Sequence, residues 1–366
     1  MKKPGRFLLC LPQLRTQPKG GDNIEFTKRD MTVLADLYRW RVKSGAQITQ
    51  RHFAGSKASY RRMKALEQAG YCEQAPYFAP VTGRTGTVRR KAGVYYQLTE
   101  KGVQVVAQAM GLREPRRARN NRVDPQDVEP RLALNDLVAM WEAAGLTVIE
   151  GREAKARWRW KRWLPCDAVL ESDGGKWLVY LMDGWSQAWE KRWKAVDFDG
   201  LTGHLLIATN AGARDALRKH VRPNGLPGEV YVLDLQRAGE AAIALTRDPQ
   251  YVYRKVADSL GKWRRDVRIT EDPEVWGLSA WRVARRGHVA QLVEVISGNL
   301  RTWKNVSGWH HEIEREAGRP EYLIVAVSDE DERQELAHEI PTAVQGRVSV
   351  WLEGQLLPLA GRTKKQ

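Results

Sequence analysis

The pattern of apolar residues between positions 26 and 110 limits the fold of this chain more than any other feature. Thr27 and Asp30 have the spacing of an N-terminal capping box, in which each side chain bonds the other residue's backbone amide. The apolar residues that follow recur at intervals of three and four, which is typical of one buried helix face. They are Met31, Leu34, Leu37 and Tyr38. A first helix is therefore predicted to begin just after Thr27.

Two more helices are predicted after the first. Residues 48–54 suit a short second helix, which Gly55 and Ser56 interrupt. Ser56 can cap a third helix that runs to residue 68, and Gly70 follows as a C-cap. We expect the side chains on the inner face of this third helix to be Tyr60, Met63 and Leu66. We expect those on its outer face to be Lys57, Ser59, Arg61, Arg62 and Lys64.

Strand-forming segments follow the third helix. Residues 71–78 and 94–98 have strand character, and residues 81–91 between them form a loop rich in Gly, Thr and Arg. Residues 99–102 open another helix. The order helix, helix, helix, strand, long basic loop, strand, helix is typical of a winged helix-turn-helix domain, which we place at residues 26–110.

The basic residues of this domain suit duplex DNA. In such a fold the third helix enters the major groove and the hairpin wing lies along the backbone or the minor groove. Arginine and lysine on the helix can meet phosphates, and an arginine can read guanine with two hydrogen bonds. An ordinary solvated, charged helix face is the alternative. The wing residues predicted to contact phosphate are Arg84, Arg89, Arg90 and Lys91.

Composition agrees with a polyanionic partner. The chain has 366 residues and a formal net charge of +16, a surplus that favours nucleic acid as partner, although a merely basic, soluble protein stays possible. Its three cysteines form no CxxC pair, so neither a disulfide framework nor a zinc site is indicated. It has no signal-peptide core and no apolar run long enough to span a membrane. We therefore expect a cytoplasmic protein without membrane contact.

Two segments are expected to be flexible. Residues 1–25 are rich in Pro, Gly and basic side chains and suit a loose arm. Residues 111–123 contain five arginines together with Pro and Asn, which is typical of a basic linker. This linker could add backbone contacts to DNA or could simply be solvated.

The rest of the chain is predicted to be α/β. Residues 124–144 suit a long helix, and strands then alternate with helices up to about residue 240. A similar order returns in residues 241–366, so a second, related α/β domain is predicted. The strands expected in the first copy lie at 167–170, 177–182, 204–209 and 230–233.

The first copy resembles the restriction-endonuclease-like core with its PD-(D/E)xK pattern. Asp167 follows Pro165-Cys166, and Asp183 ends the next strand, so the two carboxylates could hold Mg²⁺. The lysine of the pattern is missing: Trp185 stands in its place if Asp183 is the second acid, and Asp183 stands there if Leu181 holds the acid position. In the second copy Glu294 is present but Ile296 replaces the lysine. A catalytically inactive fold is favoured, although a lysine from elsewhere could serve: Lys191 or Lys194.

Considered together, these features resemble the replication-relaxation (MobC-like) family of plasmid and mobile-element proteins. The resemblance covers roughly residues 26–235 and includes the run 131–137, which opens the long helix. It implies a winged helix, a nuclease-like domain and a role at an origin of replication or transfer. It also implies a protein partner, namely a relaxase, a transposase or a replication protein.

Tryptophan is abundant, with 15 residues, and is densest in the run 157–163. On a strand, Trp158 and Trp160 would share one face, with basic residues on the other. The rings could be core residues, which is the favoured interpretation, or a stacking platform for single-stranded DNA. No NTPase loop, serine-nucleophile motif or metal-binding histidine pair is found.

The leading interpretation is a non-enzymatic DNA-binding accessory protein of a mobile element. The first alternative is a Mg²⁺-dependent nuclease that uses Asp167 and Asp183. The second is a transcriptional regulator whose C-terminal part senses a ligand or dimerises. No other cofactor is expected.

Overall fold

The computed structural model shows a mixed α+β protein. Its contacts divide the chain into two units, residues 1–139 and 140–366. In the part of the chain that is described, no helix is long and apolar enough to cross a membrane. The described residues are 25–83, 86–112, 118–161, 163–172, 175–194, 200–222, 226–247, 251–263, 268–275, 278–285, 288–313, 322–352 and 355–358.

The first helices begin at capping boxes. The box predicted at Thr27 and Asp30 is confirmed and starts α1 (Lys28–Trp40). Helix α2 (Gly45–Phe53) begins three residues earlier than expected, because Ser44 and Gln47 form a second capping box. Ser44 ends β1 (Val42–Ser44), a strand that is too short to leave a periodic signal in the sequence.

Helix α3 (Ala58–Gln68) ends as predicted, with Gly70 in the left-handed conformation at φ +77°. Its expected inner face was wrong at two positions. Ser59 is buried, whereas Tyr60 is 65% exposed. The reason is helical phase: Ser59 lies four and seven residues before Met63 and Leu66, whereas residues spaced by three drift away from a common face.

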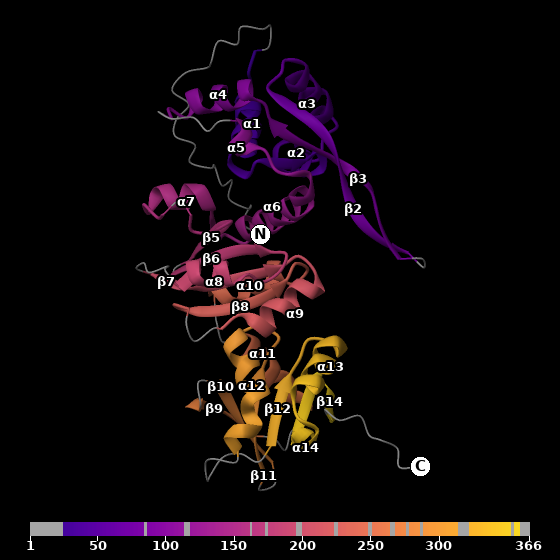
Figure 1. The fold of residues 1–366 in the computed structure, drawn as a ribbon, viewed down its shortest axis with the longest axis vertical. Helices are drawn as coiled ribbons and strands as arrows, with labels where there is room; N and C mark the ends of the chain where they lie inside the picture. Colours follow the sequence, from indigo (N-terminus) through magenta and orange to yellow (C-terminus); the bar gives the residue numbers. More distant parts are fainter. Residues whose placement is uncertain are drawn as a thin grey trace. The chain divides into compact units, whose positions relative to one another are not determined.

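The two predicted strands are longer than expected. Strands β2 (Cys72–Gly83) and β3 (Gly86–Leu98) remain paired through most of residues 81–91, where a loop was predicted. Their sheet has the order β1-β3-β2, and β1 covers β3 only from Tyr95 to Gln97. Beyond that point β2 and β3 form a two-stranded ribbon that projects from α1, α2, α3 and α4 (Figure 1). The helix predicted to open at residues 99–102 is present as α4 (Glu100–Ala109), with Thr99 as its N-cap.

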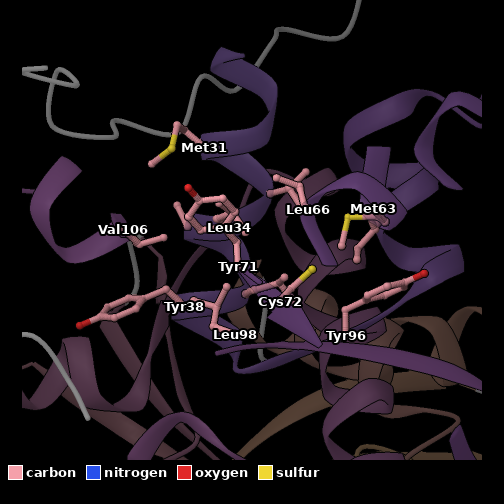
Figure 2. Packing of buried hydrophobic residues seen from close by; sticks show 14 of the residues in the cluster. Met31, Leu34, Tyr38, Met63, Leu66, Tyr71, Cys72, Tyr96, Leu98 and Val106 are labelled. Carbon is pink, nitrogen blue, oxygen red and sulfur yellow. The ribbon is translucent and has the colours of Figure 1, made fainter. Parts of the chain in front are cut away.

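One apolar core joins these elements. Side chains from α1, α3, α4 and the strands converge on a shared interior, with Leu34, Leu66 and Tyr71 fully buried (Figure 2). Each such large side chain contributes roughly 1.5–3 kcal/mol by leaving water. The core therefore fixes the orientation of α3, whose opposite face is left open to solvent.

The described end of the expected flexible linker is ordered by contacts. Residues 118–121 form the short helix α5 (Ala118–Asn121), and the buried Asn121 donates to the Leu37 carbonyl at 3.4 Å. The chain then enters the 3₁₀ turn η1 (Pro125–Asp127) and the long helix α6 (Val128–Ala143). On α6, the buried Asn135 donates to the Val42 carbonyl at 2.6 Å. Residues 113–117 and the expected arm up to residue 24 lie outside the described residues.

The second unit starts with a five-stranded sheet of order β4-β5-β6-β7-β8. Its first two pairings are antiparallel and its last two are parallel. All four strands expected from the sequence are present. The elements are β4 (Thr147–Glu150), α7 (Gly151–Arg157), β5 (Ala168–Ser172), β6 (Gly175–Met182), α8 (Gln187–Lys194), β7 (Leu201–Ala208), α9 (Ala211–His220) and β8 (Glu229–Asp234).

A six-stranded sheet follows, with the order β14-β13-β12-β11-β10-β9. From β9 to β13 it repeats the succession antiparallel, antiparallel, parallel, parallel. The order of strands and helices that was predicted to return in residues 241–366 therefore gives a second sheet with the same succession of pairings as the sheet β4–β8. The elements are α10 (Ala238–Arg247), α11 (Tyr251–Trp263), β9 (Arg268–Val275), β10 (Leu278–Arg285), β11 (His288–Glu294), α12 (Leu300–Ile313), β12 (Tyr322–Ala326), α13 (Glu330–Glu339), α14 (Thr342–Gln345), β13 (Val348–Leu352) and β14 (Gln355–Pro358).

Ion pairs connect helices that belong to the two sheets of this unit. Arg218 on α9 contacts Glu332 at 2.8 Å and Glu335 at 2.6 Å on α13. The Arg218 guanidinium also lies 4.2 Å from the ring centre of Trp303 on α12. Because Arg218 and Glu332 are both buried, removing one partner would leave an uncompensated charge in the interior.

A histidine is buried in the first sheet of this unit. The side chain of His204 on β7 bonds the Tyr180 hydroxyl through Nδ1 at 3.1 Å and the Pro227 carbonyl through Nε2 at 3.0 Å. Since a carbonyl can only accept, Nε2 carries the proton and donates to Pro227. Burial lowers the pKa of His204 to about 4, so the ring is neutral at neutral pH.

Candidate nucleic-acid interface

The exposed face of α3 carries a stripe of cations around one aromatic ring. Lys57, Tyr60, Arg61 and Lys64 are spaced by three and four residues, so they share one side of the helix. All four side chains are exposed. Within the described part of the chain, no hydrogen bond or ion pair holds the side chain of Lys57, Arg61 or Lys64. Their charges are therefore available to an external anion.

Arg62, which was predicted to contact DNA, is already engaged inside the unit. Its Nε and Nη2 atoms donate to the carboxylate of Asp30 at 2.7 and 2.6 Å, and Nη2 also donates to the Glu25 carbonyl. Burial alone would raise the pKa of Asp30, but the hydrogen bonds from Arg62 and Thr27 hold that pKa below its usual value. The same carboxylate closes the capping box of α1, so Arg62 ties α3 to the start of α1.

Ser59 also faces inward rather than toward solvent. Its hydroxyl lies 2.6 Å from the hydroxyl of Thr49 on α2. Between the two helices the backbone turns through Ala54 and Gly55, which have φ values of +50° and +83°. The hydroxyl pair and this turn fix α2 against α3. Ser59 therefore positions the helix pair, and its side chain is not on the exposed stripe.

The β2–β3 ribbon carries three of the four cations predicted for the wing. Arg90 and Lys91 are exposed, and among the described residues neither side chain has an ion-pair partner. Arg89 is also exposed, but it donates to the Phe78 carbonyl at 2.7 Å and lies 3.5 Å from Glu129. Arg84 lies outside the described residues. The described part of the ribbon therefore carries three consecutive exposed cations on β3, namely Arg89, Arg90 and Lys91.

The two carboxylates proposed from the nuclease-like pattern differ in exposure. Asp167 is half-buried and accepts from the Leu181 amide at 2.8 Å, and Asp183 is exposed after β6. Among the described residues, no group of three or more His, Cys, Asp or Glu could hold a metal ion. Of the lysines considered as replacements, Lys191 is exposed and Lys194 pairs with Glu190 at 3.0 Å.

Glu294, the acid predicted in the second copy, is buried at the end of β11. Its oxygens accept from the Ser297 amide at 2.8 Å and from the Ser297 hydroxyl at 2.7 Å. Burial raises the pKa of Glu294 to about 7, while the bonds from Ser297 oppose that rise. Glu294 therefore closes a local turn, and its role as a candidate catalytic acid stays a sequence-based prediction.

A buried ionic cluster behind the interface was missed by sequence reasoning. Asp36 on α1 is surrounded by Lys43 Nζ at 3.6 Å, Arg51 Nε at 3.3 Å and His52 Nε2 at 3.0 Å. Burial would raise the pKa of Asp36, but Lys43, His52 and Arg51 together lower it well below its usual value. No periodic signal marks this cluster, because its members come from three different elements.

The first unit therefore defines a small α+β domain with one cationic helix face and a basic β-ribbon. Residues 34–194 match the model of the family described as replication-relaxation, from within α1 to the end of α8. The match supports a relationship with this family and covers both the α3 face and the first strands of the second unit. No curated protein and no solved structure matches the chain.

Proposed function

We propose that this protein binds double-stranded DNA in the replication, mobilisation or transposition of a plasmid or other mobile element. In this proposal the first unit is a winged helix-turn-helix. Helices α2 and α3 form the helix-turn-helix, α3 enters the major groove, and the β2–β3 ribbon is the wing.

The observation that carries the proposal is the stripe of Lys57, Tyr60, Arg61 and Lys64. Three cationic side chains held by no described residue, within about two turns of helix, suit phosphates on both sides of a groove. Arginine can in addition bond the O6 and N7 atoms of guanine. A merely solvated helix face would not require the aromatic ring of Tyr60 to stand 65% exposed among them.

The ribbon supplies a second set of contacts. Two-stranded ribbons are marginally stable alone, so an exposed one of this length is best explained by a partner that it contacts. Arg90 and Lys91 suit the phosphates that flank the groove read by α3. Arg89 has Glu129 as an internal partner and would have to exchange it for phosphate.

The family match supports the biological setting of the proposal. The match of residues 34–194 to the replication-relaxation family suggests a role in plasmid or mobile-element replication or mobilisation. A relaxase, a transposase or a replication protein is the proposed protein partner. The second unit, with its two sheets, would extend the DNA contact or dock that partner.

The test is a gel-shift series with the full chain. The probe is duplex DNA from the origin or transfer region nearest the protein's own gene, and a random duplex of equal length is the competitor. Arg61→Ala/Lys64→Ala is expected to weaken binding at least tenfold, because each lost phosphate contact also loses counterion release. Lys191→Ala, an exposed lysine on α8, is the matched control and is expected to bind as the wild type does. Equal affinity of the wild type and the double variant would reject α3 as the DNA-reading helix.

A further inference from the structure

The tryptophan-rich run folds into a turn that the sequence did not predict. Helix α7 ends at Arg157, and the Trp160 amide donates back to the Lys155 carbonyl at 2.9 Å, which is the long bond of a Schellman motif. Arg159 occupies the left-handed position at φ +56°, where glycine is usual. The turn, rather than the expected strand, therefore brings Trp158 and Trp160 together, with their ring centres 4.8 Å apart.

Cations lie over these rings. The Arg157 guanidinium and the Lys176 ammonium are each 5.3 Å from the ring centre of Trp158. Lys161 lies 5.5 Å from the ring centre of Trp163. Trp158 and Trp160 also pack against the apolar core of the sheet β4–β8, and this packing holds the turn in place. Trp163 is different, because 45% of its surface is exposed.

We propose that this turn, residues 157–161 and Trp163 together with Lys176, is a binding site for single-stranded DNA that is separate from α3. Aromatic rings stack on unpaired bases of any sequence, and nearby cations follow the phosphate chain. Trp163 supplies the exposed stacking face. Arg159 and Lys161, both exposed, supply charge beside it.

The chemistry favours single-stranded DNA over two other occupants. Duplex DNA hides its base faces, so an exposed indole would gain no stacking from it. Protein interfaces are enriched in tryptophan and arginine but depleted in lysine, whereas lysines lie over two rings of this turn. The assignment also does not depend on duplex binding by α3, because it rests on different residues of a different unit.

The experiment measures the affinity of the full chain for fluorescent oligothymidylate by anisotropy. The starting protein is the Arg61→Ala/Lys64→Ala variant, in which the α3 stripe is disabled. Adding Trp163→Ala is expected to weaken oligothymidylate binding about fivefold or more, the smallest loss typical of one base stack. Trp163→Phe keeps a stacking ring and is expected to retain most of the affinity.

Two controls separate the site from general effects. Tyr322→Ala removes another exposed aromatic side chain of the same unit, 43% exposed on β12, and is expected to leave the affinity unchanged. In the otherwise wild-type chain, Trp163→Ala is expected to leave duplex affinity unchanged, so that failure of this site and failure of the α3 proposal are distinguishable. If Trp163→Ala unfolds the chain, Lys161→Gln replaces it, with a shallower salt dependence as the expected result. Unchanged oligothymidylate affinity in a folded Trp163→Ala or Lys161→Gln variant overturns the proposal.

Discussion

Adjacent arginines on α3 are expected to give opposite results when each is changed to alanine. Arg61 is exposed and has no described partner, whereas Arg62 bonds the buried carboxylate of Asp30 through two nitrogen atoms. We expect Arg61→Ala to lower DNA affinity without changing stability. We expect Arg62→Ala to lower stability first. The two variants are a matched pair, because both remove an arginine side chain and the two residues are neighbours on the same helix.

The expected magnitudes follow from the contacts. Hydrogen bonds to a charged group are each worth about 1.5–3 kcal/mol, and removing Arg62 leaves Asp30, 1% exposed, without its cation. Because Arg62 itself is partly exposed, water replaces some of this loss, and about 2 kcal/mol is expected for the first unit. Arg61→Ala is a surface change and is expected to alter the free energy of unfolding by less than about 0.5 kcal/mol.

Two assays on the full chain separate these effects. Hydrogen exchange of the α1 and α3 amides reports the stability of the first unit, and the slope of log affinity against log salt reports phosphate contacts. Arg61→Ala is expected to reduce that slope by about 0.9 while leaving exchange unchanged. Arg62→Ala is expected to speed exchange in both helices. The reverse outcome, fast exchange in Arg61→Ala and a changed slope with slow exchange in Arg62→Ala, would refute the assignment of the two side chains.

Three further changes test the supporting structure. Asp36→Asn is expected to destabilise the first unit by about 3 kcal/mol or more in chemical denaturation, because the buried ammonium of Lys43 then loses the Asp36 carboxylate. A loss below about 1 kcal/mol would contradict a stabilising role for the Asp36 cluster. The pKa of His204 is about 4 in the folded chain against an ordinary 6.5, so the unfolded state takes up the proton first as the pH falls. The second unit is therefore expected to lose up to roughly 3 kcal/mol between pH 6.5 and pH 4, and His204→Gln to flatten that dependence. Arg159→Gly removes the strain of a left-handed arginine and is expected to raise the free energy of unfolding by up to about 1 kcal/mol, seen as a slightly higher melting temperature. A clearly lower melting temperature would show that the arginine side chain itself holds the turn.

Sequence reasoning succeeded where a local signal was strong. The Thr27 box, the Gly70 C-cap and the helix that opens at residues 99–102 each depend on residues within one turn of the helix end, so they could be predicted from local sequence. Four of the five strands in the sheet β4–β8 were predicted, because each of the four contains a continuous buried apolar run. The return of the same order of strands and helices in the six-stranded sheet was predicted from apolar runs of the same kind in residues 241–366.

The errors came from features that need distant partners. The extension of the β2–β3 ladder through the glycine- and arginine-rich segment depends on cross-strand pairing, which local composition does not reveal. The tryptophan run was expected to be a strand because residues alternate, but the Schellman bond to Lys155 decides its shape. A strict helical wheel would have placed Tyr60 outside and Ser59 inside, so that error was avoidable.

The central claim is that the exposed face of α3 lies against the bases of duplex DNA, and a photo-cross-link tests it most directly. A photoreactive phenylalanine analogue in place of Tyr60 keeps an aromatic side chain at a position that is 65% exposed. The same analogue in place of Tyr322, on β12 of the other unit, is the control. We expect a cross-link from position 60 to bases of the duplex and none from position 322. Efficient duplex binding without any cross-link from position 60 would contradict it.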